Sequence, residues 1–116
     1  MISGVGVDVV DIERFRESLD RTPTLRERLF TPAEAKLPLE SLAARFAAKE
    51  AFVKALRAPA GMSWQDIEVV TTSAGAPEFV LHGAAQARAN ELGIITTHVS
   101  LSHGSSVATA FVVAEC

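Results

Sequence analysis

The chain has 116 residues, with 11 Lys and Arg against 14 Asp and Glu, which sets its formal net charge at −3 at pH 7. At 48% hydrophobic and 22% charged it has the composition of a globular domain, and the near-balanced charge excludes a general nucleic-acid-binding surface. Its one cysteine, Cys116, excludes a disulfide framework, and no apolar run approaches the ~20 residues of a membrane span. We therefore expect a single cytoplasmic domain over residues 1–116 without nucleic-acid or membrane partners.

The first predicted element is a strand over residues 2–10, where small and apolar residues alternate with a period of two. Asp8 is its only charge, and a charge in a strand is costly unless it is paired, bound to a metal or facing water at a sheet edge. Gly4 and Gly6 favour the close approach of a ligand or of another backbone. The strand leaves these alternatives open.

A helix follows, with Asp11 as its N-cap, a stripe of Ile12, Phe15 and Leu19, and an end before Pro23. Arginine is concentrated in this part of the chain: Arg14, Arg16, Arg21, Arg26 and Arg28. The planar guanidinium suits carboxylates and phosphates, so the cluster is either a docking surface for an acidic partner or a solvated face neutralised by its acidic neighbours.

Residues 31–34 (TPAE) predict a capping box on a short helix that ends at Pro38. Ser41 then opens the strongest helix of the chain, which ends before Pro59.

Three charged side chains of this helix are candidate site residues. Lys49 falls inside an apolar stripe and needs an anion or a route to solvent, while Glu50 and Lys54 lie one turn apart. Glu50 and Lys54 are either an ordinary surface pair or part of a site, because small residues beside them (Ala47, Ala48 and Ala51) would let a large partner approach.

The remaining predicted elements are strands over residues 66–72 and 78–81, a helix over 83–92, and a hairpin of strands 94–103 and 107–114. Ser100, Ser102 and His103 gather near the hairpin turn, where they form either a Ser–His nucleophilic pair or a turn-stabilising group. The three histidines lack ligand spacing, so a zinc site is not expected.

One carboxylate on a strand (Asp8) and one on a helix (Glu50), with lysines beside the second, suit a hard cation together with a phosphate. A lysine there would neutralise charge on a leaving phosphate. These residues indicate Mg²⁺-assisted phosphoryl or phosphodiester chemistry.

Four blocks in order resemble the holo-[acyl-carrier-protein] synthases, the small bacterial class of 4′-phosphopantetheinyl transferases. They are GVGVDVVDIERF (4–15), FTPAE (30–34), RFAAKEAFVKAL (45–56) and SLSHGSSVATAFVV (100–113). The resemblance implies an α+β fold with an antiparallel sheet packed on a long central helix, assembled as a homotrimer with active sites at subunit interfaces. It also implies transfer of the 4′-phosphopantetheine arm of coenzyme A to a serine of apo acyl carrier protein, within fatty acid biosynthesis and lipid metabolism.

By the same resemblance, Asp8 and Glu50 match the magnesium ligands, and Lys54 matches the lysine that contacts the coenzyme A phosphates. Glu50, directly or through a metal-bound water, is also the best-placed base for the serine proton. His103 matches the hairpin histidine near the active site and is counted among the coenzyme-binding residues. Arg14 matches the arginine that meets the acidic carrier.

Arg21 joins this carrier-binding face, since it lies seven residues after Arg14 on the side opposite the apolar stripe. Lys49 is expected among the coenzyme-binding residues. Where the family usually has glycine after Leu56, this chain has Arg57, so either Gly61 replaces that glycine or Arg57 binds a phosphate itself. The rival hypothesis, supported by this altered turn, is a catalytically silent module that only binds the carrier.

Overall fold

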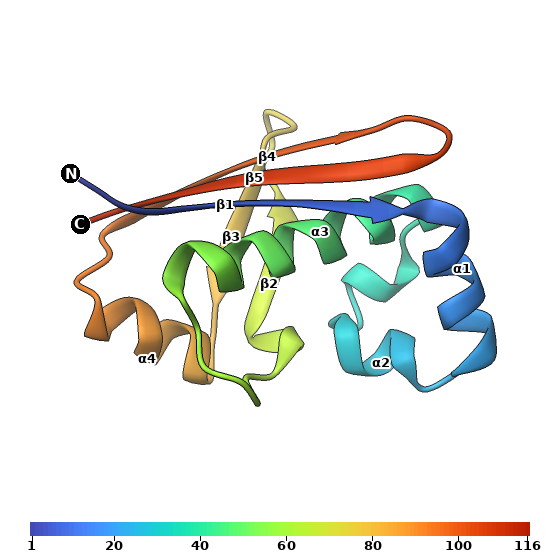
Figure 1. Cartoon of the computed structure of the whole chain (residues 1–116), viewed down its shortest axis with the longest axis horizontal. Helices are drawn as coiled ribbons and strands as arrows, with labels where there is room; N and C mark the ends of the chain where they lie inside the picture. The colour runs from blue at the N-terminus through green and yellow to red at the C-terminus, as the bar shows by residue number, and fades with distance from the viewer.

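The computed structural model describes residues 1–116 as an antiparallel sheet lying along one long helix (Figure 1). The sheet has the order β1-β5-β4, with strands β1 (Ile2–Asp11), β5 (Val107–Glu115) and β4 (Thr96–His103), and it packs on α3 (Leu39–Leu56). Both chain ends lie at the same end of this sheet. The predicted α+β class with an antiparallel sheet is confirmed.

Smaller elements cover the other sides of α3. α1 (Ile12–Arg21), α2 (Leu25–Leu29) and a 3₁₀ turn, η1 (Glu34–Lys36), lie at the N-terminal end of α3 in Figure 1. A second 3₁₀ turn, η2 (Trp64–Asp66), leads into a two-stranded sheet of β2 (Ile67–Thr71) and β3 (Pro77–Leu81), followed by α4 (Gly83–Glu91). None of the helices combines the length and apolar composition that crossing a bilayer requires.

The contact between β1 and α3 depends on two glycines. A Cβ on Gly4 would lie 1.9 Å from the carbonyl oxygen of Ala55, and a Cβ on Gly6 would lie 1.9 Å from that of Ala51. The close approach predicted for these glycines is therefore to another backbone. The alanines of α3 are buried against the sheet, so the large partner expected beside them is the protein's own sheet.

Local signals placed α1 correctly. Its stripe of Ile12, Phe15 and Leu19 is buried, and the Asp11 side chain accepts a hydrogen bond from the Arg14 N–H at 2.9 Å. The capping box is also present, since the Thr31 N–H donates to Glu34 Oε1 at 2.9 Å. It caps only a 3₁₀ turn, because Pro38 stops the chain from continuing as a helix.

Several element bounds differ from the prediction by one or two residues, as in β4, which begins at Thr96, and one helix was not predicted. α3 begins at Leu39 with Pro38 as its N-cap, because proline tolerates the position where a helical N–H would be unpaired; Ser41 is therefore inside the helix. α2 was not predicted, since five residues carry too little periodicity to detect. Asp66 belongs to η2, so the strand begins one residue later, at Ile67.

The sheet face turned away from α3 is apolar and exposed. Val5, Val7 and Val9 of β1 are 54%, 53% and 62% exposed, and Phe111 and Val107 of β5 lie in register with this row. A contiguous apolar row on a sheet surface is typical of an interface.

Candidate active site

The structure brings Asp8, Glu50 and Lys54 together where β1 crosses the last turns of α3. Lys54 Nζ donates to Asp8 Oδ1 at 3.2 Å and to the Val7 carbonyl at 2.9 Å. Glu50 lies one helical turn before Lys54, on the same side of α3. Because Gly4 and Gly6 let β1 approach closely, the strand carboxylate reaches the helix residues although 42 positions separate Asp8 from Glu50.

The charge state of the Glu50 carboxyl depends on its surroundings. Burial raises the pKa of the Glu50 carboxyl above its ordinary value, and the negative charge of Asp8 raises it further. The Lys54 ammonium opposes both effects. Glu50 is therefore a carboxylate whose negative charge lacks full compensation within the chain.

These residues fit a hard divalent cation. Two oxygen ligands are the usual protein contribution to a Mg²⁺ site that shares its metal with substrate phosphates. No third His, Cys, Asp or Glu joins them, as a closed metal cage would require. A cation between Asp8 and Glu50 would remove the repulsion that raises the pKa of Glu50.

A hollow of about 400 Å³ opens beside Glu50 and is shared with α1, whose Arg14, Phe15 and Ser18 line it. Arg14 therefore stands at the edge of the site. The arginines of α1 differ in their partners: Arg16 pairs with Glu13 and Asp20, whereas Arg14 and Arg21 are exposed and form no ion pair. Arg14 and Arg21 are thus free to bind an acidic partner.

The hairpin residues are not brought into this cluster. His103 ends β4, in register with Ala108 of β5, so a whole strand separates it from β1, and no hydrogen bond joins it to Asp8, Glu50 or Lys54. Ser102 and His103 are neighbours on one strand and point to opposite faces. A Ser102–His103 nucleophilic pair is therefore incompatible with the strand.

Lys49 does not face the site. Its side chain is completely buried, and Nζ donates to Glu34 Oε1 at 2.7 Å, to the Leu29 carbonyl at 2.8 Å and to the Trp64 carbonyl at 3.1 Å. All three ammonium donors are used inside the protein. The expected coenzyme role of Lys49 is corrected to a structural one, in which the anion it needs is Glu34.

Residues 4–112 match the family described as "4'-phosphopantetheinyl transferase superfamily". The chain belongs to this superfamily. It is 56% identical over 115 residues to a holo-[acyl-carrier-protein] synthase of Leifsonia xyli subsp. xyli, an alignment covering 99% of this chain and 98% of the relative. The resemblance inferred from the four sequence blocks is confirmed.

Solved structures of such synthases share the fold. The crystal structure from Neisseria meningitidis superposes with a TM-score of 0.91 at 34% identity, and the match covers 100% of both chains. The Helicobacter pylori synthase, solved in complex with coenzyme A, gives a TM-score of 0.84 at 31% identity over 96% of this chain and 99% of that one. Both superpositions therefore extend over at least 96% of this chain.

In this superfamily member, the turn after α3 adopts an uncommon backbone. Arg57 has φ 48° and ψ 48°, the left-handed conformation that usually requires glycine at a helix end, and Gly61 has φ 90°. Arg57 therefore takes the backbone role of glycine, while its side chain is exposed. Sequence analysis singled out both residues without predicting which would be left-handed.

Two arginines of the transferase were missed. Arg88 of α4 donates to the carbonyl oxygens of Leu56 and Arg57 at the end of α3. Arg45 of α3 lines a second hollow of about 270 Å³ beside β2. No local signal could have found Arg88, because its acceptors are 31 and 32 positions away.

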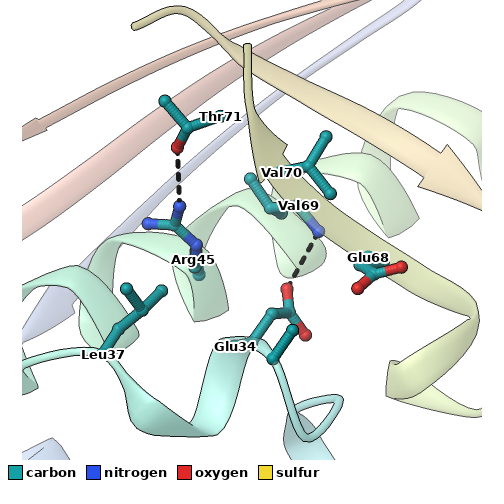
Figure 2. A pocket seen from close by; sticks show the side chains of 8 residues that line it. Glu34, Leu37, Arg45, Glu68, Val69, Val70 and Thr71 are labelled. Carbon is teal, nitrogen blue, oxygen red and sulfur yellow. Dashed lines mark hydrogen bonds between the residues drawn. The ribbon is translucent and has the colours of Figure 1, made fainter. Parts of the chain in front are cut away.

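Figure 2 shows the second hollow, with Arg45 donating to Thr71 Oγ1 at 3.0 Å and Glu34 accepting from the Val69 N–H at 2.9 Å. Burial lowers the pKa of Arg45, and the carboxylate of Glu34 opposes this. Glu34 thus joins η1, α3 and β2, and Arg45 ties α3 to the end of β2.

Proposed function

We propose that the chain transfers 4′-phosphopantetheine from coenzyme A to a serine of apo acyl carrier protein, releasing 3′,5′-ADP. The observation that carries this proposal is the cluster of Asp8, Glu50 and Lys54 where β1 crosses α3. In the reaction, the serine oxygen attacks the phosphorus that bears the pantetheine. The bond from that phosphorus to the oxygen of 3′,5′-ADP breaks as the new phosphodiester forms.

In this proposal Lys54 stabilises the negative charge that develops on the leaving 3′,5′-ADP. Its side chain is 55% exposed, so its ammonium is accessible to a phosphate. Glu50 accepts the serine proton, directly or through a water molecule, as the general base. Asp8 and Glu50 would hold Mg²⁺, which supplies charge neutralisation for the pyrophosphate.

We assign coenzyme contacts to Lys54, Arg57, Gly61 and His103, and carrier contacts to Arg14 and Arg21. The exposed apolar row of Val5, Val7, Val9, Val107 and Phe111 supports a homotrimer, because a second copy would bury it. Assembly would also bring one chain's His103 near another chain's carboxylates. A role in fatty acid biosynthesis and a cytoplasmic location belong to the same proposal.

The deciding experiment incubates the protein with coenzyme A, Mg²⁺ and an apo carrier, and follows the carrier by mass spectrometry. The expected result is a carrier heavier by one phosphopantetheine group. Asp8→Ala and Glu50→Ala are expected to abolish this gain while circular dichroism still shows a folded protein, and excess chelator is expected to stop the wild type. A folded wild type that leaves the carrier mass unchanged would favour the silent carrier-binding module.

A further inference from the structure

We infer that Arg88 of α4 is a positioning residue for coenzyme binding, because it holds the turn after α3 in its left-handed geometry. Arg88 Nε donates to the Leu56 carbonyl at 3.0 Å, and Nη2 donates to the Arg57 carbonyl at 3.1 Å. The consequence for coenzyme binding rests on the proposed function; the effect on the turn does not.

The end of α3 shows why such a donor is needed. An α-helix leaves its last carbonyl groups without intrahelical partners. The turn itself satisfies two of them, since the Ala58 N–H donates to the Val53 carbonyl at 3.0 Å and the Arg57 N–H to the Lys54 carbonyl at 3.3 Å. The Leu56 and Arg57 carbonyls receive their hydrogen bonds from Arg88. A cation at this position also complements the negative end of the helix dipole.

The two acceptors of Arg88 lie on either side of the Arg57 Cα. The orientation of the Leu56 carbonyl depends on φ of Arg57, and that of the Arg57 carbonyl depends on ψ. A planar guanidinium that binds both oxygens therefore restrains both dihedral angles. Arg57 needs this restraint, because a residue with a Cβ reaches φ 48°, ψ 48° only at a cost that glycine avoids.

The restrained turn connects directly to the site. The turn begins three residues after Lys54 and carries the exposed side chain of Arg57. We assign both Lys54 and Arg57 to the coenzyme phosphates. Arg88 itself is only 22% exposed, and its Nη1 lies 3.6 Å from Glu91 Oε2. Protein oxygen atoms therefore lie against all three guanidinium nitrogens, Nε, Nη1 and Nη2, so we infer that Arg88 acts through the turn.

The test compares the wild type with Arg88→Ala. Calorimetry measures coenzyme A affinity, and hydrogen exchange is followed at the backbone amides of residues 57, 58, 60 and 61. We expect Arg88→Ala to bind coenzyme A about tenfold more weakly and to exchange about tenfold faster in the turn, as the loss of charge-assisted hydrogen bonds would produce. In turnover assays KM for coenzyme A should rise, while kcat and KM for the carrier change less than about twofold. Arg88→Lys, which keeps the charge without the planar fork, should lie between the two and serves if Arg88→Ala fails to fold.

Repeating Arg88→Ala in the Arg57→Gly background isolates the mechanism. Glycine adopts the left-handed turn unaided, so Arg88→Ala should there change affinity less than about twofold. This comparison cancels any contact that the Arg57 side chain makes with the coenzyme. Equal losses in both backgrounds would overturn the inference.

Ala89→Gly is the matched control, since it weakens α4 beside Arg88 without removing either hydrogen bond. It should lower the melting temperature and leave coenzyme affinity unchanged; a loss like that of Arg88→Ala would reduce Arg88 to a stabilising residue. If the wild type binds no coenzyme A, the proposed function fails, and amide exchange alone decides whether Arg88 holds the turn. Unchanged exchange in folded Arg88→Ala would overturn the inference in either case.

Discussion

Two lysines five residues apart on α3 differ in their burial and in their partners. Lys49 is completely buried, and a carboxylate and two carbonyl oxygens satisfy its ammonium. Lys54 is 55% exposed and pairs with Asp8, whose side chain is 15% exposed, through a longer contact of 3.2 Å. The first pair has no capacity left for a ligand, whereas the second can exchange a protein contact for a phosphate. The same residue type on one helix therefore stabilises the fold in one place and serves chemistry in the other.

Breaking the buried Lys49–Glu34 pair should have the largest effect on stability. Lys49→Met leaves Glu34 charged, buried and without its cation. Losing one partner of such a buried pair typically costs about 3–5 kcal/mol, which is a large fraction of the stability of a small domain. Urea unfolding monitored by circular dichroism measures the loss. Adding Glu34→Gln to Lys49→Met should recover part of it by removing the unpaired charge. A single variant as stable as the wild type would contradict the structural role of Lys49.

Breaking the more exposed Lys54–Asp8 pair should affect turnover instead. Lys54→Met is expected to lower kcat by roughly 10²–10³, the usual cost of losing one stabiliser of developing charge. Because the pair is exposed, the free energy of unfolding should change by less than about 1 kcal/mol. Steady-state kinetics beside urea unfolding separate the two effects. An unchanged kcat with a raised KM for coenzyme A would make Lys54 a binding residue only.

The arginines of α1 allow the comparison to be extended to an acidic partner. Arg14→Glu should raise KM for the carrier about tenfold or more at low salt, leave KM for coenzyme A unchanged and flatten the salt dependence. Arg21→Glu should act in the same direction more weakly, being at the end of the helix. Arg16→Ala is the control, since Glu13 and Asp20 already neutralise Arg16. A similar effect of all three would indicate bulk charge rather than a docking face.

The proximity of Asp8 and Glu50 should make the stability of the protein depend on pH. The folded pKa of Glu50 is raised above its ordinary 4.5, so the folded protein holds this proton more readily than the unfolded chain. Without a divalent cation, the contribution of Glu50 to stability therefore falls as pH rises from about 4.5 through the folded pKa. Mg²⁺ at ten times its Kd should add about 1.4 kcal/mol near pH 7 and lose this effect at acid pH.

Thermal unfolding with and without Mg²⁺ across this pH range tests the prediction. Glu50→Gln is expected to flatten the pH dependence and to remove the magnesium effect. A magnesium effect that survives in Glu50→Gln would place the cation elsewhere.

Sequence patterns predicted what neighbours along the chain determine. The buried stripe of α1 and the Thr31–Glu34 capping box follow from contacts within a few residues, and the β4–β5 hairpin follows from its short turn together with the alternation of its two strands. Lys49 was misassigned because its partners Leu29, Glu34 and Trp64 are 15 to 20 positions away, and periodicity carries no information on such contacts.

The site itself shows the same limit. Periodicity placed Glu50 and Lys54 on one side of a helix and Asp8 in a strand, but only the family resemblance joined strand and helix into one site. Gly4 and Gly6 predicted a close contact of the strand but not the partner in that contact. Arg88 was missed because its role depends on a left-handed residue at Arg57, where sequence rules favour glycine.

In the proposed metal site, the contact of Gly4 and Gly6 with the backbone of α3 would affect ion selectivity. These glycines set the separation of β1 from α3, and hence that of the carboxylates we assign to the metal. Mg²⁺ demands oxygen ligands at about 2.0–2.1 Å, whereas Ca²⁺ accepts about 2.3–2.6 Å in a looser shell. A methyl group on Gly6 must move the strand outward, which would shift the preference of the site toward the larger ion. Discrimination between two cations of equal charge would then depend on a position that carries no side chain and never touches the metal.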